Sequence, residues 1–474
     1  MKRVGLFSVL LSLALFTQAQ VDTTQQVFRL DDLYQRMLLH HPITKQSNLI
    51  TEIAQRELLM MRGGFDPKLE ADYNTKELDG TFYYSYWDAA LKIPAWIGEF
   101  KVGYELNEGD LISAENKTPS GGTWYAGVSV PIGRNLLIDA RRNALRQAQL
   151  LQEIAEADRI KEINKLFLEA TKAYWDWYIA YNEYEFRQEA YRLAEVRFQG
   201  TKDRVYGGDV APIDSVEAKI NLQDRDISLR QARVDANNAR LILSNYLWAE
   251  DNVPLEIPAD AQPQDFDIYN RFLDESALQQ LVAFAQENHP ELIKLNFKLK
   301  QLAIEQRFAR DRLKPDINVN YNFLTGNPIE TSEFGGDYAT NNYKFGFDFS
   351  FPLFLRKERG KSQQVQLKLN QTSFERTQTS RDIITEINTV YNEMRILQEN
   401  VRQQEEMVEN YQTLTEGEYI KFQNGESSVF LINSREVSLI ESQIKLVSFR
   451  AKYEKEKATL IWAAGQRLWE QPQE

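Results

Sequence analysis

The chain contains a long internal duplication, which restricts its fold more than any other feature of the sequence. Three short motifs of the first half recur in the second half at one constant offset of 248 positions. The pairs are His41-Pro42 with His289-Pro290, Pro67 with Pro315, and Tyr73-Asn74 with Tyr321-Asn322. Because spacing is preserved together with residue type, we expect two halves built on one pattern.

Later matches show that the halves differ in length at one place. Val130-Pro131-Ile132 corresponds to Phe351-Pro352-Leu353 at an offset of 221, and Gly208 corresponds to Gly425 at 217. The fall from 248 to 221 predicts 27 additional residues in the first half, within roughly residues 78–107. That is the length of one extra β-hairpin, and alternation of Phe100, Val102, Tyr104 and Leu106 with polar residues supports a strand there.

Each half shows the same succession of periodicities: a helical stretch, strands, a very long helical stretch and a shorter one. We expect a signal peptide at residues 1–19, a first repeat at 20–253, a linker at 254–273 and a second repeat at 274–474. The predicted strands span about 67–131, with the extra hairpin at about 78–107, and about 316–352. The predicted helices span about 30–61, 139–199, 211–248, 275–313, 357–422 and 429–462.

The two longest helices would each extend roughly 90 Å, which exceeds the diameter of a compact domain. Apolar residues recur in them at spacings of three and four, as in Ala144, Ala148, Leu151 and Ala155. This stripe indicates antiparallel coiled-coil packing along the helices.

Strict alternation gives the predicted strands one apolar face and one polar face. In the clearest case Tyr343, Phe345, Phe347, Phe349 and Phe351 alternate with Lys344, Gly346, Asp348 and Ser350. A soluble sandwich also alternates, but here the strands are few and interrupt very long helices. No stretch after the signal peptide approaches the roughly 20 apolar residues of a membrane-spanning helix. We therefore expect a transmembrane barrel with a wet lumen, completed by oligomerisation, whose lipid-facing residues include these five aromatics.

The sequence offers little for catalysis or cofactor binding. Its only histidines are His40, His41 and His289, and two of them belong to the repeated His-Pro motif rather than to a metal-ligand spacing. It has no phosphate-binding glycine loop and no nucleophile elbow. The formal charge of −13 disfavours nucleic acid. We expect no enzyme activity, no cofactor, no metal site and no nucleic-acid partner. The aromatic cluster Trp175, Trp177, Tyr178, Tyr181 and Tyr184 suits inter-helix packing better than a ligand platform.

Taken together, these features resemble the TolC-like outer-membrane efflux family over nearly the whole mature chain. The resemblance rests on the duplicated motifs, on the segment Gly346 to Phe354, and on two glycine motifs, Arg204 to Gly208 followed by Asp214, and Tyr419 to Gly425. It implies a membrane α+β protein that forms a homotrimer. The three protomers share one transmembrane β-barrel, which has twelve strands in the usual family pattern. A long periplasmic antiparallel coiled-coil α-helical barrel continues it. The sequence leaves open whether the extra hairpin enters the barrel.

The resemblance also implies partners and a functional end of the molecule. In the family, the turns between long and short helices form a periplasmic tip that closes at rest and meets a periplasmic adaptor protein. An inner-membrane pump works with it, directly or through the adaptor. The corresponding residues here are Tyr206, Gly207, Gly208, Asp214, Phe422, Gly425 and Ser427. The two glycines could equally serve only to end a helix with positive φ.

One departure concerns the gate. Some family members carry aspartates six and nine positions after the second tip glycine, where this chain has Leu431 and Ser434, so no acidic ring is expected there. Asp214 matches an aspartate that can brace the closed tip.

The predicted function is an outer-membrane channel of a tripartite efflux or type I secretion system, conducting solutes passively from the periplasm. The main alternative is an exported periplasmic coiled-coil scaffold without a channel. The sequence does not choose among drugs, metal ions and proteins as substrates.

Overall fold

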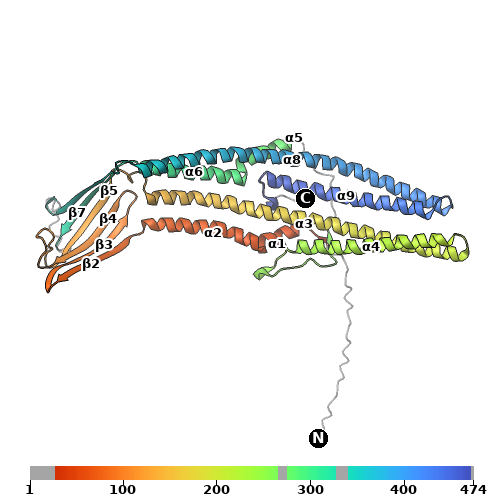
Figure 1. Ribbon diagram of the computed structural model, residues 1–474, viewed down its shortest axis with the longest axis horizontal. Coiled ribbons are helices and arrows are strands. Elements are labelled where there is room, and N and C mark those ends of the chain that lie inside the picture. Colours follow the sequence, from red (N-terminus) through yellow and green to blue (C-terminus); the bar gives the residue numbers. More distant parts are fainter. Residues whose placement is uncertain (1–26, 265–274, 327–339, 471–474) are drawn as a thin grey trace, which may run out of the picture.

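The computed structural model describes residues 27–264, 275–326 and 340–470. The predicted signal peptide, the second half of the linker and most of the loop at 325–342 lie outside these ranges. The protein is elongated, with a curled β-sheet at one end and helices that run away from it side by side (Figure 1). Within the described residues, no helix is both long enough and apolar enough to cross a membrane.

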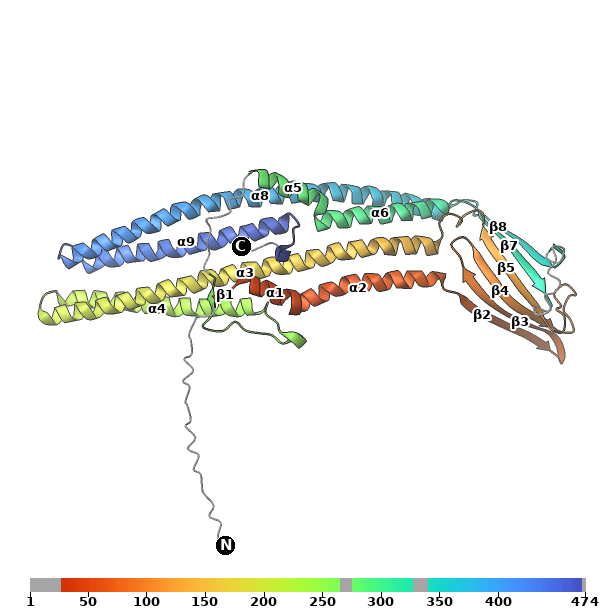
Figure 2. The same cartoon turned by 180° about the vertical axis from the view of Figure 1, so that it is seen from behind.

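Two helices of equal length, α3 (Ala140–Gly207) and α8 (Arg356–Gln423), extend from the sheet to the far end of the molecule (Figure 2). Each has 68 residues and therefore spans about 100 Å. Near the sheet, α2 (Pro42–Arg62) packs on α3 and α6 (Pro290–Asp311) packs on α8. Farther away, α4 (Pro212–Ser244) and α9 (Val429–Ala463) take those places. The helices form four columns, two continuous and two built from successive shorter helices.

Three of the predicted helices require correction. The first long helix continues to Gly207 rather than ending near residue 199, because Gly200 lies inside it with open space around its Cα. The stretches predicted as single helices at 30–61 and 275–313 are each divided in two. The first comprises α1 (Leu30–His40) and α2, and the second comprises α5 (Glu275–Asn288) and α6.

The repeated His-Pro motif explains both divisions. His41 and His289 have extended backbone at the N-caps of α2 and α6, and Pro42 and Pro290 occupy the first helical position. Nδ1 of His41 accepts from the Ile43 amide at 3.1 Å, and Nδ1 of His289 accepts from the Glu291 amide at 3.2 Å. The proline supplies a preset φ where no amide donor is needed, and the imidazole satisfies one of the free amides of the first turn.

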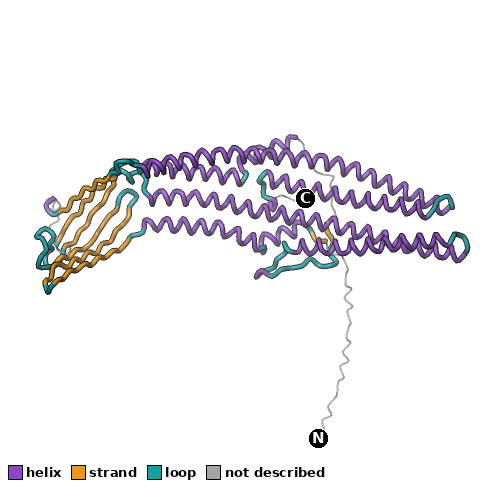
Figure 3. The backbone as a smooth tube through the Cα atoms, viewed as in Figure 1, coloured by secondary structure: helices purple, strands orange, loops and turns teal. Residues whose placement is uncertain are grey.

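The sheet has six antiparallel strands in the order β2-β3-β4-β5-β7-β8. The strands lie together at one end of the molecule, and helices occupy the rest of its length (Figure 3). Their bounds are β2 (Lys68–Leu78), β3 (Thr81–Pro94), β4 (Glu99–Glu108), β5 (Thr123–Pro131), β7 (Asp316–Thr325) and β8 (Tyr343–Ser350). β3 and β4 occupy the segment in which the sequence predicts an additional hairpin. The first half thus contributes four strands and the second half two.

The helices that run away from the sheet are named here the stalk. The main apolar core lies midway along the stalk, where α1 and the ends of α4 and α9 meet the middle of α3. Trp175, Trp177 and Tyr178 are buried in it, so these three members of the aromatic cluster pack helices together, whereas Tyr181 and Tyr184 are partly buried. The Tyr174 hydroxyl donates to the Phe28 carbonyl at 2.8 Å and accepts from the Gln264 amide at 2.9 Å. Two short strands, β1 (Val27–Phe28) and β6 (Gln262–Pro263), pair beside this core and join the start of the first half to the linker that follows it.

Candidate functional site

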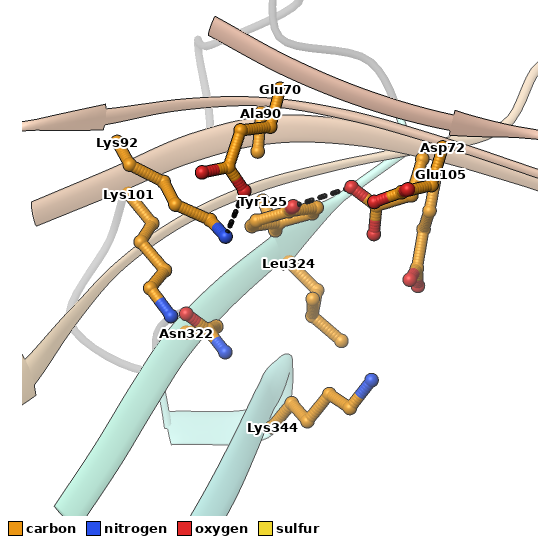
Figure 4. A pocket seen from close by; sticks show the side chains of 11 residues that line it. Glu70, Asp72, Ala90, Lys92, Lys101, Glu105, Tyr125, Asn322, Leu324 and Lys344 are labelled. Carbon is orange, nitrogen blue, oxygen red and sulfur yellow. Dashed lines mark hydrogen bonds and ion pairs between the residues drawn. The ribbon is translucent and has the colours of Figure 1, made fainter. Parts of the chain in front are cut away.

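One face of the sheet is polar and concave. A hollow of about 310 Å³ on this face is lined by side chains from all six strands, which shows that the sheet curls around it (Figure 4). Lys92 on β3 forms an ion pair with Glu70 on β2 at 2.5 Å, and the Tyr125 hydroxyl on β5 donates to Asp88 at 2.9 Å. Lys101, Glu105 and Lys344 add further charge. Such a surface suits water and polar solutes.

The opposite face is apolar across every strand pair. The register places Phe349 opposite Ile317, Phe347 opposite Val319 and Phe345 opposite Tyr321, and the same face continues through β5, β4, β3 and β2. Its other members include Val128, Val130, Phe100, Val102, Leu91 and Leu69. Of the five aromatics predicted to face lipid, Tyr343, Phe345, Phe347 and Phe349 lie on this face of β8, and all four are more than half exposed. Phe351 follows one residue after the strand ends and is also exposed.

At the far end of the stalk, two turns with the same backbone geometry join long helices to short ones. Gly208 and Gly425 have φ values of 81° and 76°, in the left-handed region that favours glycine. Each glycine amide donates to the carbonyl three residues earlier, and the next amide donates five residues back, from Asp209 to Arg204 and from Glu426 to Lys421, both at 2.9 Å. These bonds satisfy carbonyls at the end of each helix.

The predicted tip residues lie together at this end, in different environments. Tyr206 is 82% exposed, and Gly207 and Gly208 are exposed beside it. The Arg204 guanidinium lies 5.6 Å from the centre of the Phe422 ring, which joins the tip of α3 to the tip of α8. The Ser427 hydroxyl donates to the buried Glu418 carboxylate at 2.5 Å. Asp214 lies in the first turn of α4, and its side chain forms no hydrogen bond or ion pair with any described residue.

A buried polar network near the tip was not predicted from the sequence. Arg197 on α3 donates to both carboxylate oxygens of Glu436 on α9, to Asn433 Oδ1 at 2.5 Å and to the Tyr419 hydroxyl on α8 at 2.7 Å. The Tyr419 hydroxyl donates in turn to Glu436. The side chains of Arg197 and Glu436 are 9% and 8% exposed. This network, named here the Arg197 cluster, ties the first half of the chain to the second.

The protonation of the Arg197 cluster follows from its contacts. Burial acts to lower the pKa of Arg197, but hydrogen bonds and charge from Glu436 outweigh it, so this pKa is raised and the guanidinium stays charged. Burial and the bond to Glu436 raise the pKa of Tyr419 to about 12, which keeps its hydroxyl as a donor. The cluster is therefore a charged clamp at neutral pH.

The described residues contain no group of three or more side chains suited to hold a metal ion. Burial lowers the pKa of both His41 and His289 to about 4, and their Nδ1 atoms already accept from backbone amides. These histidines act in helix capping.

Comparison with known proteins agrees with this arrangement. Residues 281–466 match the sequence model of a family described as outer membrane efflux protein. No curated protein matches the chain by sequence.

Solved structures of outer-membrane channels share the fold. The Campylobacter jejuni CmeC outer membrane channel gives a TM-score of 0.64 at 13% identity, over 92% of this chain and 85% of CmeC. The open state of the Neisseria gonorrhoeae MtrE outer membrane channel gives a TM-score of 0.65 at 15% sequence identity, over 93% of this chain and 89% of MtrE. The outer membrane protein VceC of Vibrio cholerae gives a TM-score of 0.63 at 14% sequence identity, over 92% of this chain and 96% of VceC.

The shared fold covers most of each of these three neighbours, and two of them are named as channels. Residues 281–466 of this chain are thus similar to the outer membrane efflux protein family, and nearly its whole length has the fold of solved outer-membrane channels.

Proposed function

We propose that the chain is one protomer of a homotrimeric outer-membrane channel in a tripartite efflux or type I secretion system. Three sheets form a transmembrane barrel, and three sets of helices continue it as a periplasmic coiled-coil tunnel. The channel conducts solutes passively from the periplasm to the exterior once its tip opens.

The observation that carries the proposal is the two-faced sheet. A concave polar face with exposed charges suits a wet lumen, and a continuous exposed apolar face suits lipid, with Tyr343, Phe345, Phe347, Phe349 and Phe351 in contact with it. A single sheet with both edges open leaves backbone donors and acceptors unsatisfied in a bilayer. Neighbouring protomers would satisfy them.

The tip supports the proposed gating. Its two turns expose apolar side chains such as Tyr206, Ile213 and Phe430, which suit contact with an adaptor. We assign the adaptor contact to Tyr206, Gly207, Gly208, Asp214, Phe422, Gly425 and Ser427. The unpartnered Asp214 is available to brace a neighbouring protomer. Adaptor binding favours the open arrangement, and an inner-membrane pump supplies the energy.

The organisation of the chain fits a duplication. We propose that residues 20–253 and 274–474 are two structural repeats separated by a linker at 254–273. Both repeats order their elements as short helix, helix, strands, long helix and shorter helix.

A membrane barrel needs its apolar face in lipid, whereas a soluble scaffold does not. We expect the mature protein in the outer-membrane fraction, extracted only by detergent, with the mass of a trimer, and conducting ions in planar bilayers. Phe347→Arg places a charge in lipid, at a cost of about 2–4 kcal/mol per protomer, and should abolish insertion. Asp348→Arg, its neighbour on the polar face, is the matched control and should insert normally. A monomer that is freely soluble without detergent would instead support the periplasmic scaffold.

A further inference from the structure

We propose that three copies close an eighteen-stranded barrel, in which β8 of each protomer pairs with β2 of the next and the extra hairpin forms part of the wall. This inference rests on the proposed trimeric channel. The partner at each edge of the sheet is a second copy of this chain, and the barrel is wider than one of twelve strands.

The hairpin of β3 and β4 is paired along its whole length. β2 and β3 run in register from Lys68 opposite Lys92 to Leu78 opposite Thr81, with one irregularity after Lys76. β3 and β4 pair from Pro94 opposite Glu99 to Ser85 opposite Glu108, without interruption. β4 also pairs with β5 over seven positions. The hairpin is therefore an integral part of the sheet and not a flap beside it.

The same hairpin keeps the division into two faces. Leu91 pairs with Val102 and Ala89 with Tyr104 on the apolar face, while Asp88 pairs with Glu105 and Lys92 with Lys101 on the polar face. Lys92, Lys101 and Glu105 line the same hollow as Tyr125 and Asn322 from the other strands (Figure 4). A hairpin lying outside a barrel would have no reason to continue this division.

The two edges of the sheet are complementary in direction. Within the described residues, β2 and β8 are the outer strands and each has one pairing neighbour. Six strands that alternate in direction leave β8 antiparallel to β2, so one copy can add to the next without breaking the alternation. Both edges carry exposed apolar side chains, with Leu69 80% exposed and Phe347 57% exposed. Closure buries these edges and leaves no free backbone groups in the membrane.

The added strands change the shape of the channel. Barrel diameter grows roughly linearly with strand number, so eighteen strands give about 1.5 times the diameter of twelve. The stalk keeps four helical columns per protomer, because no helix accompanies the extra hairpin. The narrowest passage therefore lies in the stalk or at the tip, and the strand region is a wide vestibule.

Engineered disulfides test the seam between copies, because the chain contains no cysteine. Asp72→Cys on the polar face of β2 is combined in turn with Lys344→Cys, Gly346→Cys and Asp348→Cys on β8. Cα atoms of directly paired strands lie about 4.5–5.5 Å apart, within disulfide range, whereas strands two places apart do not. Oxidation of the trimer in outer membranes should give a ladder of linked dimers and trimers on a non-reducing gel for at least one combination.

Matched controls separate the outcomes. Asp88→Cys with Glu105→Cys joins registered partners within one chain and should give no ladder. Glu105→Cys on β4 with the same three β8 positions reports a twelve-stranded barrel that leaves out β2 and β3, so a ladder there overturns the inference. A disulfide between β2 and β8 of one chain, or an intact trimer with no ladder, overturns it as well. Loss of the trimer itself would contradict the proposed function instead.

A second measurement uses the size of the barrel. In end-on electron micrographs of the trimer, the strand region should be about 1.5 times as wide as in a variant lacking residues 81–108. Equal widths would overturn the inference. If the deletion variant does not assemble, the disulfide pairs in the full chain still decide the question.

Discussion

The two halves of the chain agree closely in their helices and differ in their strands. α3 and α8 both have 68 residues, α4 and α9 have 33 and 35, and α2 and α6 have 21 and 22. The sheet receives four strands from the first half and two from the second. An added pair of antiparallel strands runs out and back, so the chain returns to the same end of the sheet. The following helix therefore begins at the same end of the sheet with or without the added pair. A longer helix would instead displace one tip turn from the other, so helix lengths are restricted while strand number is not.

The agreement extends to details of capping and turning. Both halves use a His-Pro cap, a left-handed glycine at the tip, and a second glycine eight residues before it, Gly200 and Gly417. The halves differ at the start of the helix after the tip, which has Ala211 at the N-cap in one and Ser428 in the other. Mutations at paired positions therefore measure how equivalent the halves are.

The largest effect is expected where the halves are joined. Arg197→Ala should destabilise the protein by about 3–5 kcal/mol, because it removes the ion pair and hydrogen bonds of the buried Glu436 and leaves only the charge of Arg225 nearby. The loss in the free energy of unfolding is measured in detergent, with tryptophan fluorescence as the signal. Hydrogen exchange should also become faster in both tip turns. Arg187→Ala is the control: Arg187 bonds Glu441 between the same two helices at 3.1 Å, but Glu441 is 56% exposed, so the cost should stay below about 1 kcal/mol. Equal losses for the two variants would show that the Arg197 cluster is not a clamp.

The two histidine caps should make stability depend on pH. Their pKa values are near 4 in the folded protein and about 6.5 in the unfolded chain, so the unfolded chain binds more protons between these values. Their contribution is complete above about pH 6.5 and is lost as the pH falls towards 4, by up to roughly 3 kcal/mol for each histidine. Denaturation between pH 7.5 and 5 measures the slope.

Asparagine variants separate the two halves in this measurement. His41→Asn and His289→Asn keep a capping acceptor without a titrating group, and each should remove about half of the slope. Glu454 acts in the opposite direction, because burial raises its pKa to about 6 and acid then favours the folded state, so Glu454→Gln is the control background. A slope that depends on one histidine alone would break the equivalence of the halves.

The tip glycines should respond alike. Gly208→Ala and Gly425→Ala should each cost about 1–2 kcal/mol, because alanine is strained at positive φ. No atom lies within 4 Å of a Cβ at either position, so the cost is one of backbone conformation alone. Gly200→Ala and Gly417→Ala, in equally open positions inside the helices, should instead stabilise by about 0.5–1 kcal/mol. Thermal melting of all four variants tests the contrast, and losses at the helical pair would refute it.

Local patterns account for what the sequence could predict. Alternation at Tyr343 to Phe349 fixes the faces of a strand, because neighbouring side chains point in opposite directions whatever the strand pairs with. The positions of Gly208 and Gly425 follow from helix-end chemistry in the same way. The end of α3 was wrong by eight residues because Gly200 resembles a helix stop, whereas a helix packed along its whole length tolerates it.

The Arg197 cluster could not be predicted for the opposite reason. Arg197 meets Tyr419 and Glu436 across separations of 222 and 239 residues, and nothing near Arg197 in the sequence distinguishes it from the other arginines of α3. Its partners become visible only when the two halves pack. The family resemblance drew attention to Asp214 instead, whose side chain has no partner among the described residues.

The smallest effect concerns the N-cap of the helix that follows each tip turn. Ser428 Oγ accepts from the Leu431 amide at 3.3 Å, whereas Ala211 leaves the first turn of α4 without a side-chain acceptor beside Pro212. Because the bond is long, Ser428→Ala should cost only about 0.5 kcal/mol, and Ala211→Ser should gain a similar amount. Hydrogen exchange of the first turns of α4 and α9 is the sensitive measurement. Each substitution gives one half the cap of the other, so protection should exchange between the turns. If Ala211→Ser leaves α4 unchanged, Pro212 already fixes that turn, and the halves begin their tip helices by different means.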